Sequence, residues 1–124
     1  MIYNKSDRGK QAYFDGLQAE EVVKQHLIEQ GFTILAQRRK TPHGEIDLLV
    51  SNEMYLIAIE VKQRKNLKES ALALSLTQQK RLLAALDLTI TQQPDWVRPN
   101  IRFDVYLLDK AMNMRHIEDA IRLF

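Results

Sequence analysis

Two acidic residues and a lysine near the middle of the chain have the types and spacing of a metal site. The letters GEID end at Asp47, and the letters EVKQR begin at Glu60 and include Lys62. Two ionised carboxylates about 5 Å apart repel each other by roughly 3 kcal/mol at an effective dielectric constant near 20. A shared proton, the Lys62 ammonium or a divalent cation would offset this repulsion, and hard oxygen ligands with open positions suit Mg²⁺.

The strands that carry these residues form a predicted hairpin over residues 45–50 and 55–62. Side chains alternate between the two faces of a strand. A turn centred on residues 52–53 or on residues 53–54 places Asp47 opposite Ala58 or Glu60. In both registers Asp47 shares a face with Glu60 and Lys62. A purely structural ion pair between Lys62 and either carboxylate explains the same spacing, and both interpretations stay open.

The remaining elements surround this hairpin. Helix formers over residues 7–30 precede Gly31, a residue typical of a helix C-terminus. A second helix is expected over residues 77–91, with Thr77 as its N-cap. The expected core stripes of the two helices are Ala19, Val23 and Leu27, and Leu76, Leu83, Leu86 and Ile90. The other expected elements are a strand over 32–36, a turn over 41–44, a loop over 92–100, a strand over 101–108 and a terminal helix over 117–123.

This order, α-β-β-β-α-β, predicts an α/β sandwich with a mixed β-sheet flanked by helices. The helical crossover lets the last strand pair in parallel with the hairpin. Glu20 projects beside Leu27 at the edge of the first apolar stripe. A carboxylate so close to the core is either a paired boundary residue or part of a site.

Composition limits the kind of protein. The 124 residues suit a single domain over 1–124, and 45% hydrophobic with 27% charged residues are ordinary globular values. Cysteine is absent, which excludes disulfides and thiolate metal sites. No apolar run reaches the roughly 20 residues of a membrane helix, so we expect a cytoplasmic protein that does not bind membranes.

Charge is unevenly distributed along the chain. The formal net charge is +2, but residues 38–81 hold nine basic and five acidic side chains. From charge alone, solvated faces of a sheet and a helix account for this excess better than a nucleic-acid partner does.

The motifs at the hairpin resemble those of the YraN-like family, a bacterial family of predicted endonucleases in the restriction-endonuclease-like superfamily. The family pattern is an Asp followed by Glu-x-Lys, here Asp47 with Glu60 and Lys62, and the likeness extends from Gly16 to about Ala120. Further matching motifs are Gly16 with Glu20, Lys80 with Arg81, the letters RFDV at 102–105, and His116 with Ala120. The departures are Ala19 in place of a glycine, a missing asparagine within 38–40, and the letters LKES at 67–70 in place of Phe-Gly.

The resemblance implies a restriction-endonuclease-like fold and a magnesium-dependent endonuclease, with Mn²⁺ as a substitute cation. Asp47 and Glu60 would bind the metal together with the Val61 carbonyl, and Glu20 would approach directly or through water. Lys62 would orient the attacking water or stabilise the charged phosphorane; an ordinary lysine, with a pKa of about 10.4, is a poor base. The cations expected to contact phosphates are Arg64, Lys80 and Arg81.

Other conspicuous residues favour structural roles. We expect His43 to face solvent rather than bind metal, Asp104 to pair with Arg102, and Trp96 to plug its loop against the core.

The leading hypothesis is therefore an endonuclease that acts on DNA, with branched DNA as one candidate substrate. A symmetric homodimer would suit a two-fold branched substrate, although no feature of the sequence demonstrates one. The rival hypotheses are a non-catalytic nucleic-acid-binding module that retains the nuclease fold, and a structural or regulatory interaction domain.

Overall fold

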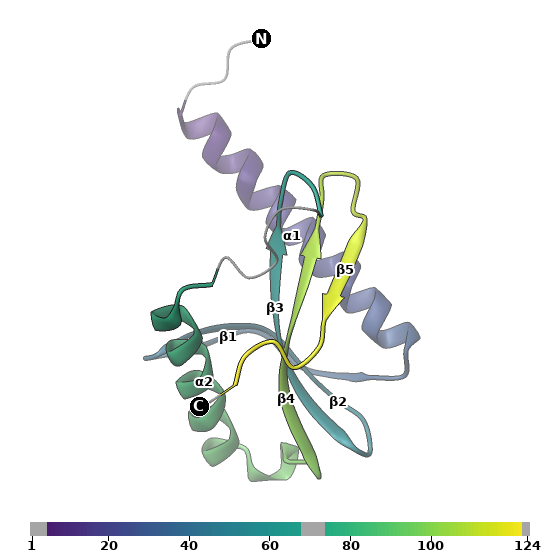
Figure 1. Cartoon of the computed structure of the whole chain (residues 1–124), viewed down its shortest axis with the longest axis vertical. Coiled ribbons are helices and arrows are strands. Elements are labelled where there is room, and N and C mark those ends of the chain that lie inside the picture. Colours follow the sequence, from purple (N-terminus) through teal and green to yellow (C-terminus); the bar gives the residue numbers. More distant parts are fainter. Residues whose placement is uncertain (1–4, 68–73, 123–124) are drawn as a thin grey trace.

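The chain forms a five-stranded mixed β-sheet with one helix on each face (Figure 1). The computed structural model describes residues 5–67 and 74–122, and for residues 5–15 it describes the backbone alone. In chain order the elements are α1 (Lys5–Glu29), β1 (Thr33–Thr41), β2 (Gly44–Ser51), β3 (Tyr55–Gln63), α2 (Leu76–Gln92), the short 3₁₀ helix η1 (Pro94–Trp96), β4 (Asn100–Leu108) and β5 (Met114–Ile117).

The strands lie side by side in the order of the sequence, β1-β2-β3-β4-β5. Strands β3 and β4 are parallel because α2 carries the chain back across the sheet, whereas the other neighbouring pairs are antiparallel. Leu49 pairs with Ala58, so the hairpin turn is centred on residues 53–54, one of the two predicted registers. The predicted mixed α/β architecture and the parallel crossover are confirmed.

Alternating residues of the central strands pack into two apolar cores, one on each face of the sheet. Ile57 and Ile59 of β3 pack under α1, whereas Leu56 and Ala58 pack under α2. The predicted stripe of α1 is confirmed, because Ala19, Val23 and Leu27 are all buried in the same core as Ile57 and Ile59. Each large aliphatic side chain that is fully buried stabilises the fold by about 1.5–3 kcal/mol.

The ends of the helices are fixed by local hydrogen bonds. Gly31 has φ +92° and follows α1; its N–H donates to the Ile28 carbonyl, and the Phe32 N–H donates to the Leu27 carbonyl. These two bonds form a Schellman motif, which ends the helix as predicted.

No helix in the part of the chain described here is long and apolar enough to cross a membrane.

The predicted start of α2 is wrong. Ser75, not Thr77, is the N-cap: its hydroxyl accepts the Gln78 N–H, and the Gln78 side chain accepts the Ser75 N–H. This reciprocal capping box satisfies two donors that a helix start leaves free. With the start moved, Leu76 lies in the first turn and is 67% exposed, so its assignment to the core is also wrong.

The predicted terminal helix over 117–123 is wrong across the described residues. Met114–Ile117 forms strand β5 along β4, and residues 118–122 are not helical. The Asp119 N–H donates to the Asp104 carboxylate at 2.9 Å, and the Ala120 N–H donates to the Phe103 carbonyl at 2.8 Å. Contacts to β4 therefore satisfy backbone donors that a helix would have left free in its first turn. Residues 123 and 124 of the predicted helix lie outside the described residues.

Strand β1 is longer than the predicted strand over 32–36 and contains two irregularities. The register shifts between Ile34 and Ala36, and Arg38 has φ +48°. A left-handed residue costs a non-glycine side chain about 1–2 kcal/mol. Across the ladder from Arg38, side-chain alternation in β2 is interrupted, because Ile46 packs under α2 and Leu48 packs under α1. The residue between them is Asp47.

Candidate active site

Asp47 lies where strands β2 and β3 stop pairing. The last backbone pair of this ladder toward Asp47 is Leu48 with Ile59. Just beyond it, the Val61 N–H donates to Asp47 Oδ2 at 2.8 Å. A carboxylate therefore occupies the position where a strand N–H ordinarily meets a neighbouring carbonyl. This bond holds the Asp47 side chain against β3.

Glu60 and Lys62 come from β3, beside Asp47. The Glu60 side chain is buried, with 8% of the residue exposed, and Lys62 Nζ lies 3.1 Å from Glu60 Oε1. The predicted meeting of Asp47, Glu60 and Lys62 is confirmed. The ion pair considered as a structural alternative is also present, between Lys62 and Glu60. If Asp47 and Glu60 are both ionised, the single ammonium of Lys62 balances only one of the two negative charges.

The electrostatics of the two carboxyl groups reflect their burial. Removal from water, followed by the negative charge of Glu60, raises the pKa of Asp47 to about 8, although the Val61 N–H bond opposes the change. Burial also raises the pKa of Glu60, against the opposing Lys62 ammonium. Burial thus shifts both carboxyl groups toward their neutral forms relative to water. A cation that binds the ionised forms would have to displace a proton at neutral pH.

Glu20 brings a third carboxylate to this place from α1. Its Oε2 accepts a hydrogen bond from Arg38 Nε at 2.9 Å. Its negative charge contributes to raising the pKa of both Asp47 and Glu60. The interpretation of Glu20 as a paired boundary residue is therefore confirmed, and its role in a site stays a prediction.

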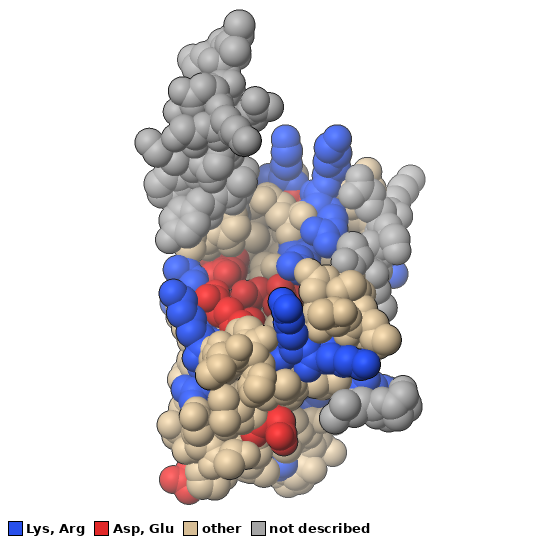
Figure 2. Space-filling view, turned by 90° about the vertical axis from the view of Figure 1, so that its left-hand side faces the viewer, with Lys and Arg blue, Asp and Glu red and all other residues tan. Residues whose placement is uncertain are grey.

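A pocket of about 160 Å³ opens between β3 and α2; the carboxylates that line it are Glu60 and Glu45, whereas Asp47 and Glu20 do not line it. Glu60 and Lys62 form its β3 wall, and Gln78 and Arg81 line it from α2. His43 belongs to the exposed turn between β1 and β2 and lines the same pocket. Figure 2 shows acidic side chains gathered in a hollow on one face of the molecule, with basic side chains on either side.

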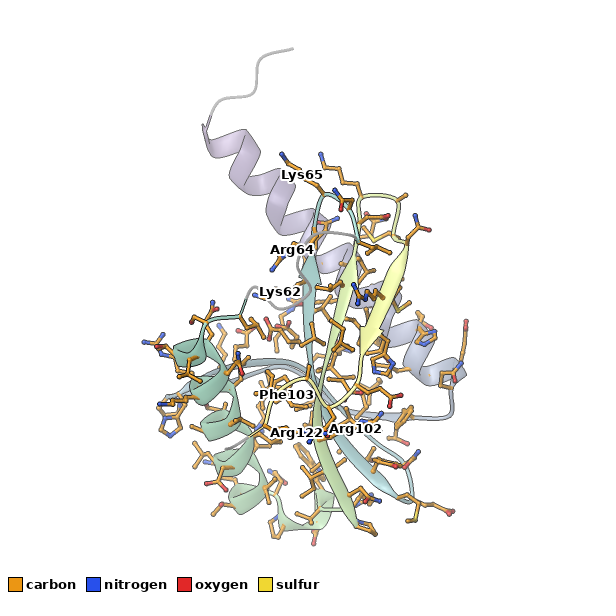
Figure 3. All side chains as sticks on the ribbon, viewed as in Figure 1. Lys62, Arg64, Lys65, Arg102, Phe103 and Arg122 are labelled. Atoms are coloured by element: carbon orange, nitrogen blue, oxygen red, sulfur yellow. The ribbon has the colours of Figure 1, made fainter. Side chains whose placement is uncertain are left out.

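The three cations predicted to contact phosphates are placed differently. Arg81 lines the pocket, so the structure brings it together with Lys62. Lys80 is exposed one position earlier on α2, and Arg64 follows β3, where its N–H donates to the Leu108 carbonyl. Figure 3 shows Lys62, Arg64 and Lys65 in succession along one end of β3. Arg64 and Lys80 therefore flank the pocket rather than line it.

The donor set partly fits a divalent cation. Among the described residues, no three Asp, Glu or His side chains lie close enough together to hold a metal ion. Asp47 and Glu60 supply two hard oxygen ligands, and Mg²⁺ is commonly bound by one or two carboxylates, with waters and substrate phosphates completing its shell. Two carboxylates thus suit a magnesium site that keeps open positions. Val61 contacts Asp47 through its N–H, and metal binding by its carbonyl stays a prediction.

A larger hollow of about 430 Å³ lies beside Phe103 and Arg122, away from Lys62 and Arg64 (Figure 3). Its two cations are already paired, Arg102 with Asp104 and Arg122 with Asp119. We therefore place the site by its charge imbalance rather than by the size of the hollow.

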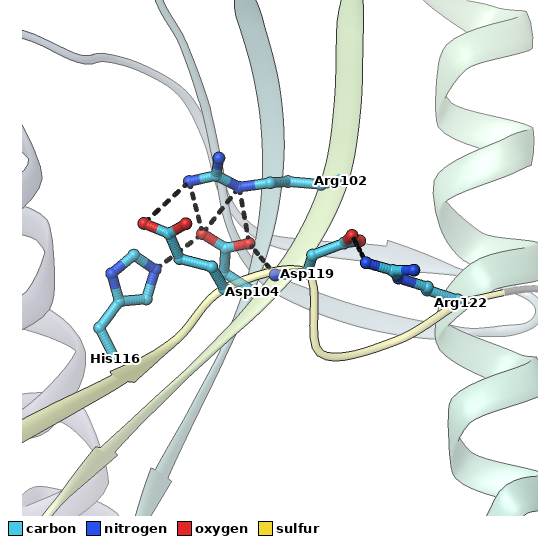
Figure 4. A network of polar contacts seen from close by, with 6 residues as sticks. Arg102, Asp104, His116, Asp119 and Arg122 are labelled. Carbon is cyan, nitrogen blue, oxygen red and sulfur yellow. Dashed lines mark hydrogen bonds and ion pairs between the residues drawn. The ribbon is translucent and has the colours of Figure 1, made fainter.

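Asp104 is the centre of a separate polar network (Figure 4). It is 1% exposed and accepts hydrogen bonds from Arg102 Nε at 2.9 Å and Arg102 Nη2 at 3.1 Å. His116 Nε2 lies 2.8 Å from Asp104 Oδ2, and the His116 ring stacks on Tyr106. The predicted structural pair of Arg102 and Asp104 is confirmed. The network also brings the RFDV motif at 102–105 together with His116, which belongs to a separate motif in the sequence.

Trp96 packs against the core under α2, as predicted, and the Arg39 guanidinium lies 5.5 Å from the centre of its ring.

Sequence reasoning missed Arg38 and Gln78 as residues of the site. A signal for Arg38 was present, because a carboxylate at a core boundary such as Glu20 requires a cationic partner and a basic run begins at residue 38. Gln78 carried no comparable signal.

Comparison with known proteins gives the family. A family model described as Uncharacterised protein family UPF0102 matches residues 19–108. A UPF0102 protein of Granulibacter bethesdensis is 43% identical over 116 residues, which cover 94% of this chain and 73% of that protein. The chain belongs to UPF0102. A UPF0102 protein of Acidiphilium cryptum is 38% identical over 123 residues, 96% of this chain and 95% of that protein, and one of Azorhizobium caulinodans is 37% identical over 116 residues, 94% of this chain and 88% of that protein.

The UPF0102 match confirms the resemblance drawn from the GEID and EVKQR motifs at the level of the family. Its span, residues 19–108, contains every residue predicted for the site, from Glu20 to Arg81. It also contains Asp104, whereas His116 lies beyond it. The acidic site is thus part of the region by which UPF0102 is defined.

Proposed function

We propose that the chain is a magnesium-dependent endonuclease that hydrolyses phosphodiester bonds in DNA, with a restriction-endonuclease-like fold. Branched DNA is one candidate substrate. The single observation that carries the proposal is the pairing of the half-buried Asp47 with the buried Glu60, whose Oε1 lies 3.1 Å from Lys62 Nζ, beside a pocket that Glu60, Lys62 and Arg81 line. A module that only binds nucleic acid gains nothing from two acidic groups whose ionisation burial opposes.

Asp47 and Glu60 are the residues that would hold the cation. Their oxygens come from adjacent strands, and the Val61 N–H fixes the orientation of Asp47. A divalent cation bound there would neutralise phosphate charge and acidify a bound water. Because both side chains come from strands and the Val61 N–H holds the Asp47 carboxylate, little reorganisation is needed to present them.

Lys62 would act on the reacting phosphate. Its ammonium is held next to Glu60 and lines the pocket, so it can reach a group bound there. We assign it the stabilisation of negative charge that develops in the transition state. Arg81 would bind a phosphate in the same pocket, and Arg64 after β3 and Lys80 on α2 would bind phosphates beside it.

The test is cleavage of linear, single-stranded, flapped and four-way DNA by highly purified protein, with and without Mg²⁺. We expect cleavage that requires Mg²⁺ and is abolished in Asp47→Asn. Lys62→Ala should lower turnover at saturating DNA on the order of 10²-fold with little change in DNA affinity. Lys65→Ala is the matched control, because it removes the same charge from the same end of β3 outside the pocket (Figure 3).

Two results would contradict the proposal. The first is a folded Lys62→Ala variant, verified by thermal melting, that cleaves at the wild-type rate. The second is salt-sensitive DNA binding without cleavage under any of these conditions, which would establish the rival hypothesis of a non-catalytic binding module.

A further inference from the structure

Arg38 reaches the acidic site through an unusual backbone conformation. Its φ of +48° lies in the left-handed region, in the middle of β1, between the ladder pairs Gln37 with Leu48 and Arg39 with Ile46; Asp47 lies between the β2 members of these pairs. From there its guanidinium binds Glu20 of α1 at 2.9 Å. A strained non-glycine residue persists only where the surrounding structure holds it, and such residues cluster at functional sites.

The charge of the site depends on this residue. Glu20, Asp47 and Glu60 act on one another electrostatically, and the cations paired with them are Lys62 and Arg38. With all three carboxylates ionised, the group carries a net charge of minus one, and a bound divalent cation makes it plus one. A phosphodiester carries one negative charge, so the cation-loaded site attracts it. Without Arg38 the cation-loaded site is neutral.

We propose that Arg38 is a positioning residue that serves as the internal counter-ion of the site: by neutralising Glu20, it weakens the binding of a divalent cation and strengthens the binding of a phosphodiester to the cation-loaded site. This inference rests on the proposed function and adds to it a residue that sets its charge balance. It predicts that removing Arg38 changes the two affinities in opposite directions.

The test uses three variants. Arg38→Asn removes the charge but keeps the backbone conformation, because asparagine is among the non-glycine residues most common in the left-handed region. Arg38→Lys keeps the charge. Lys40→Asn is the control, because it removes the charge of an exposed side chain of β1 that has no hydrogen bond or ion pair within the described residues.

Two affinities are measured at low ionic strength, where screening is weakest. Calorimetry gives the Kd of Mn²⁺ alone. Fluorescence anisotropy in Mn²⁺ gives the Kd of a phosphorothioate duplex, which keeps the backbone charge and resists hydrolysis. Arg38→Asn should tighten Mn²⁺ binding about 3- to 10-fold and weaken duplex binding by a similar factor, because its guanidinium is partly exposed and its field is partly screened. Arg38→Lys should return both values to within about twofold of wild type.

The other outcomes each overturn the inference in a recognisable way. Weaker binding of both Mn²⁺ and duplex would indicate a structural role, and a lowered melting temperature would accompany it. Weaker duplex binding with unchanged Mn²⁺ affinity would make Arg38 a simple phosphate contact. An equal change in Lys40→Asn would show a general charge effect. If the wild-type protein binds no Mn²⁺ with or without duplex, the proposed function fails, and the inference fails with it.

Discussion

At the scale of single residues, the site places acidic groups where burial opposes their ionisation. Asp47 is held by one backbone N–H and faces a second carboxylate, and its pKa is raised to about 8. In water an aspartate has a pKa near 4. Between these two values the folded chain keeps a proton that the unfolded chain releases. Rising pH across this range therefore favours the unfolded state.

This sign leads to a prediction for Asp47→Asn. The variant should be more stable than the wild type at pH 8.5, by at least about 2 kcal/mol, because the amide needs no proton to remain neutral. The difference should shrink as the pH falls toward 4 and vanish well below 4, where Asp47 is protonated in both states. Urea unfolding at several pH values in the presence of EDTA measures this difference. A stability difference that does not vary with pH would contradict the raised pKa.

The residues of the site could be predicted to different extents. Strand alternation places Asp47, Glu60 and Lys62 together, because the two turns considered, centred on residues 52–53 and 53–54, give the same shared face; a three-residue loop would not. The contact of Arg38 with Glu20 could not be predicted in this way. It depends on one left-handed residue within β1, and a local pattern carries no information on a conformation that tertiary contacts impose.

At the scale of elements, helix α2 positions Arg81 and Gln78 at the pocket, and its first turn is fixed by the capping box at Ser75. Ser75→Ala should therefore destabilise the protein by about 1 kcal/mol. Thr77→Ala is the matched control: Thr77 is exposed in the first turn of the helix, and we expect a change within about 0.5 kcal/mol. Chemical denaturation of the two variants compares them directly. Equal losses would mean that the capping box does not stabilise the helix.

The elements themselves were predicted best where a periodic pattern was long. Helix α1, the hairpin and β4 follow from apolar periodicity and turn residues. Strand β5 did not, because four residues are too few to show a period and its stability comes from pairing with β4. The backbone after β5 is held by the buried Asp104 carboxylate, a long-range contact that no local pattern predicts.

At the scale of the whole molecule, a small net charge conceals a polarised surface. Figure 2 shows basic side chains on either side of an acidic hollow, and the formal net charge of +2 does not reveal this separation of charge. Because each phosphate contact releases counter-ions, Arg64→Ala and Lys80→Ala should each reduce the slope of log K against log salt for DNA binding by about one unit. Cleavage at saturating DNA should largely persist in both variants.

Arg122→Ala provides the control for this prediction. Arg122 is exposed and lies far from Lys62 and Arg64 in the view of Figure 3, so its removal changes the net charge equally. We expect its salt slope to match that of the wild type. The same loss of slope in all three variants would show that DNA senses only the total charge, and would argue against a defined binding face.

The parallel pairing of β3 with β4 has a consequence for the kinetics of folding. The hairpin of β2 and β3 closes over a few residues, whereas β4 joins β3 only after the 36 residues between Gln63 and Asn100 have formed a loop. Contacts of long sequence separation form late, since loop closure costs entropy. We expect Ile57→Val to slow refolding, and Asp104→Asn to accelerate unfolding while refolding stays nearly unchanged, in stopped-flow measurements across urea concentrations. The strands that carry Asp47 and Glu60 would then associate before the sheet is complete, and the contacts of Asp104 would be among the first to break.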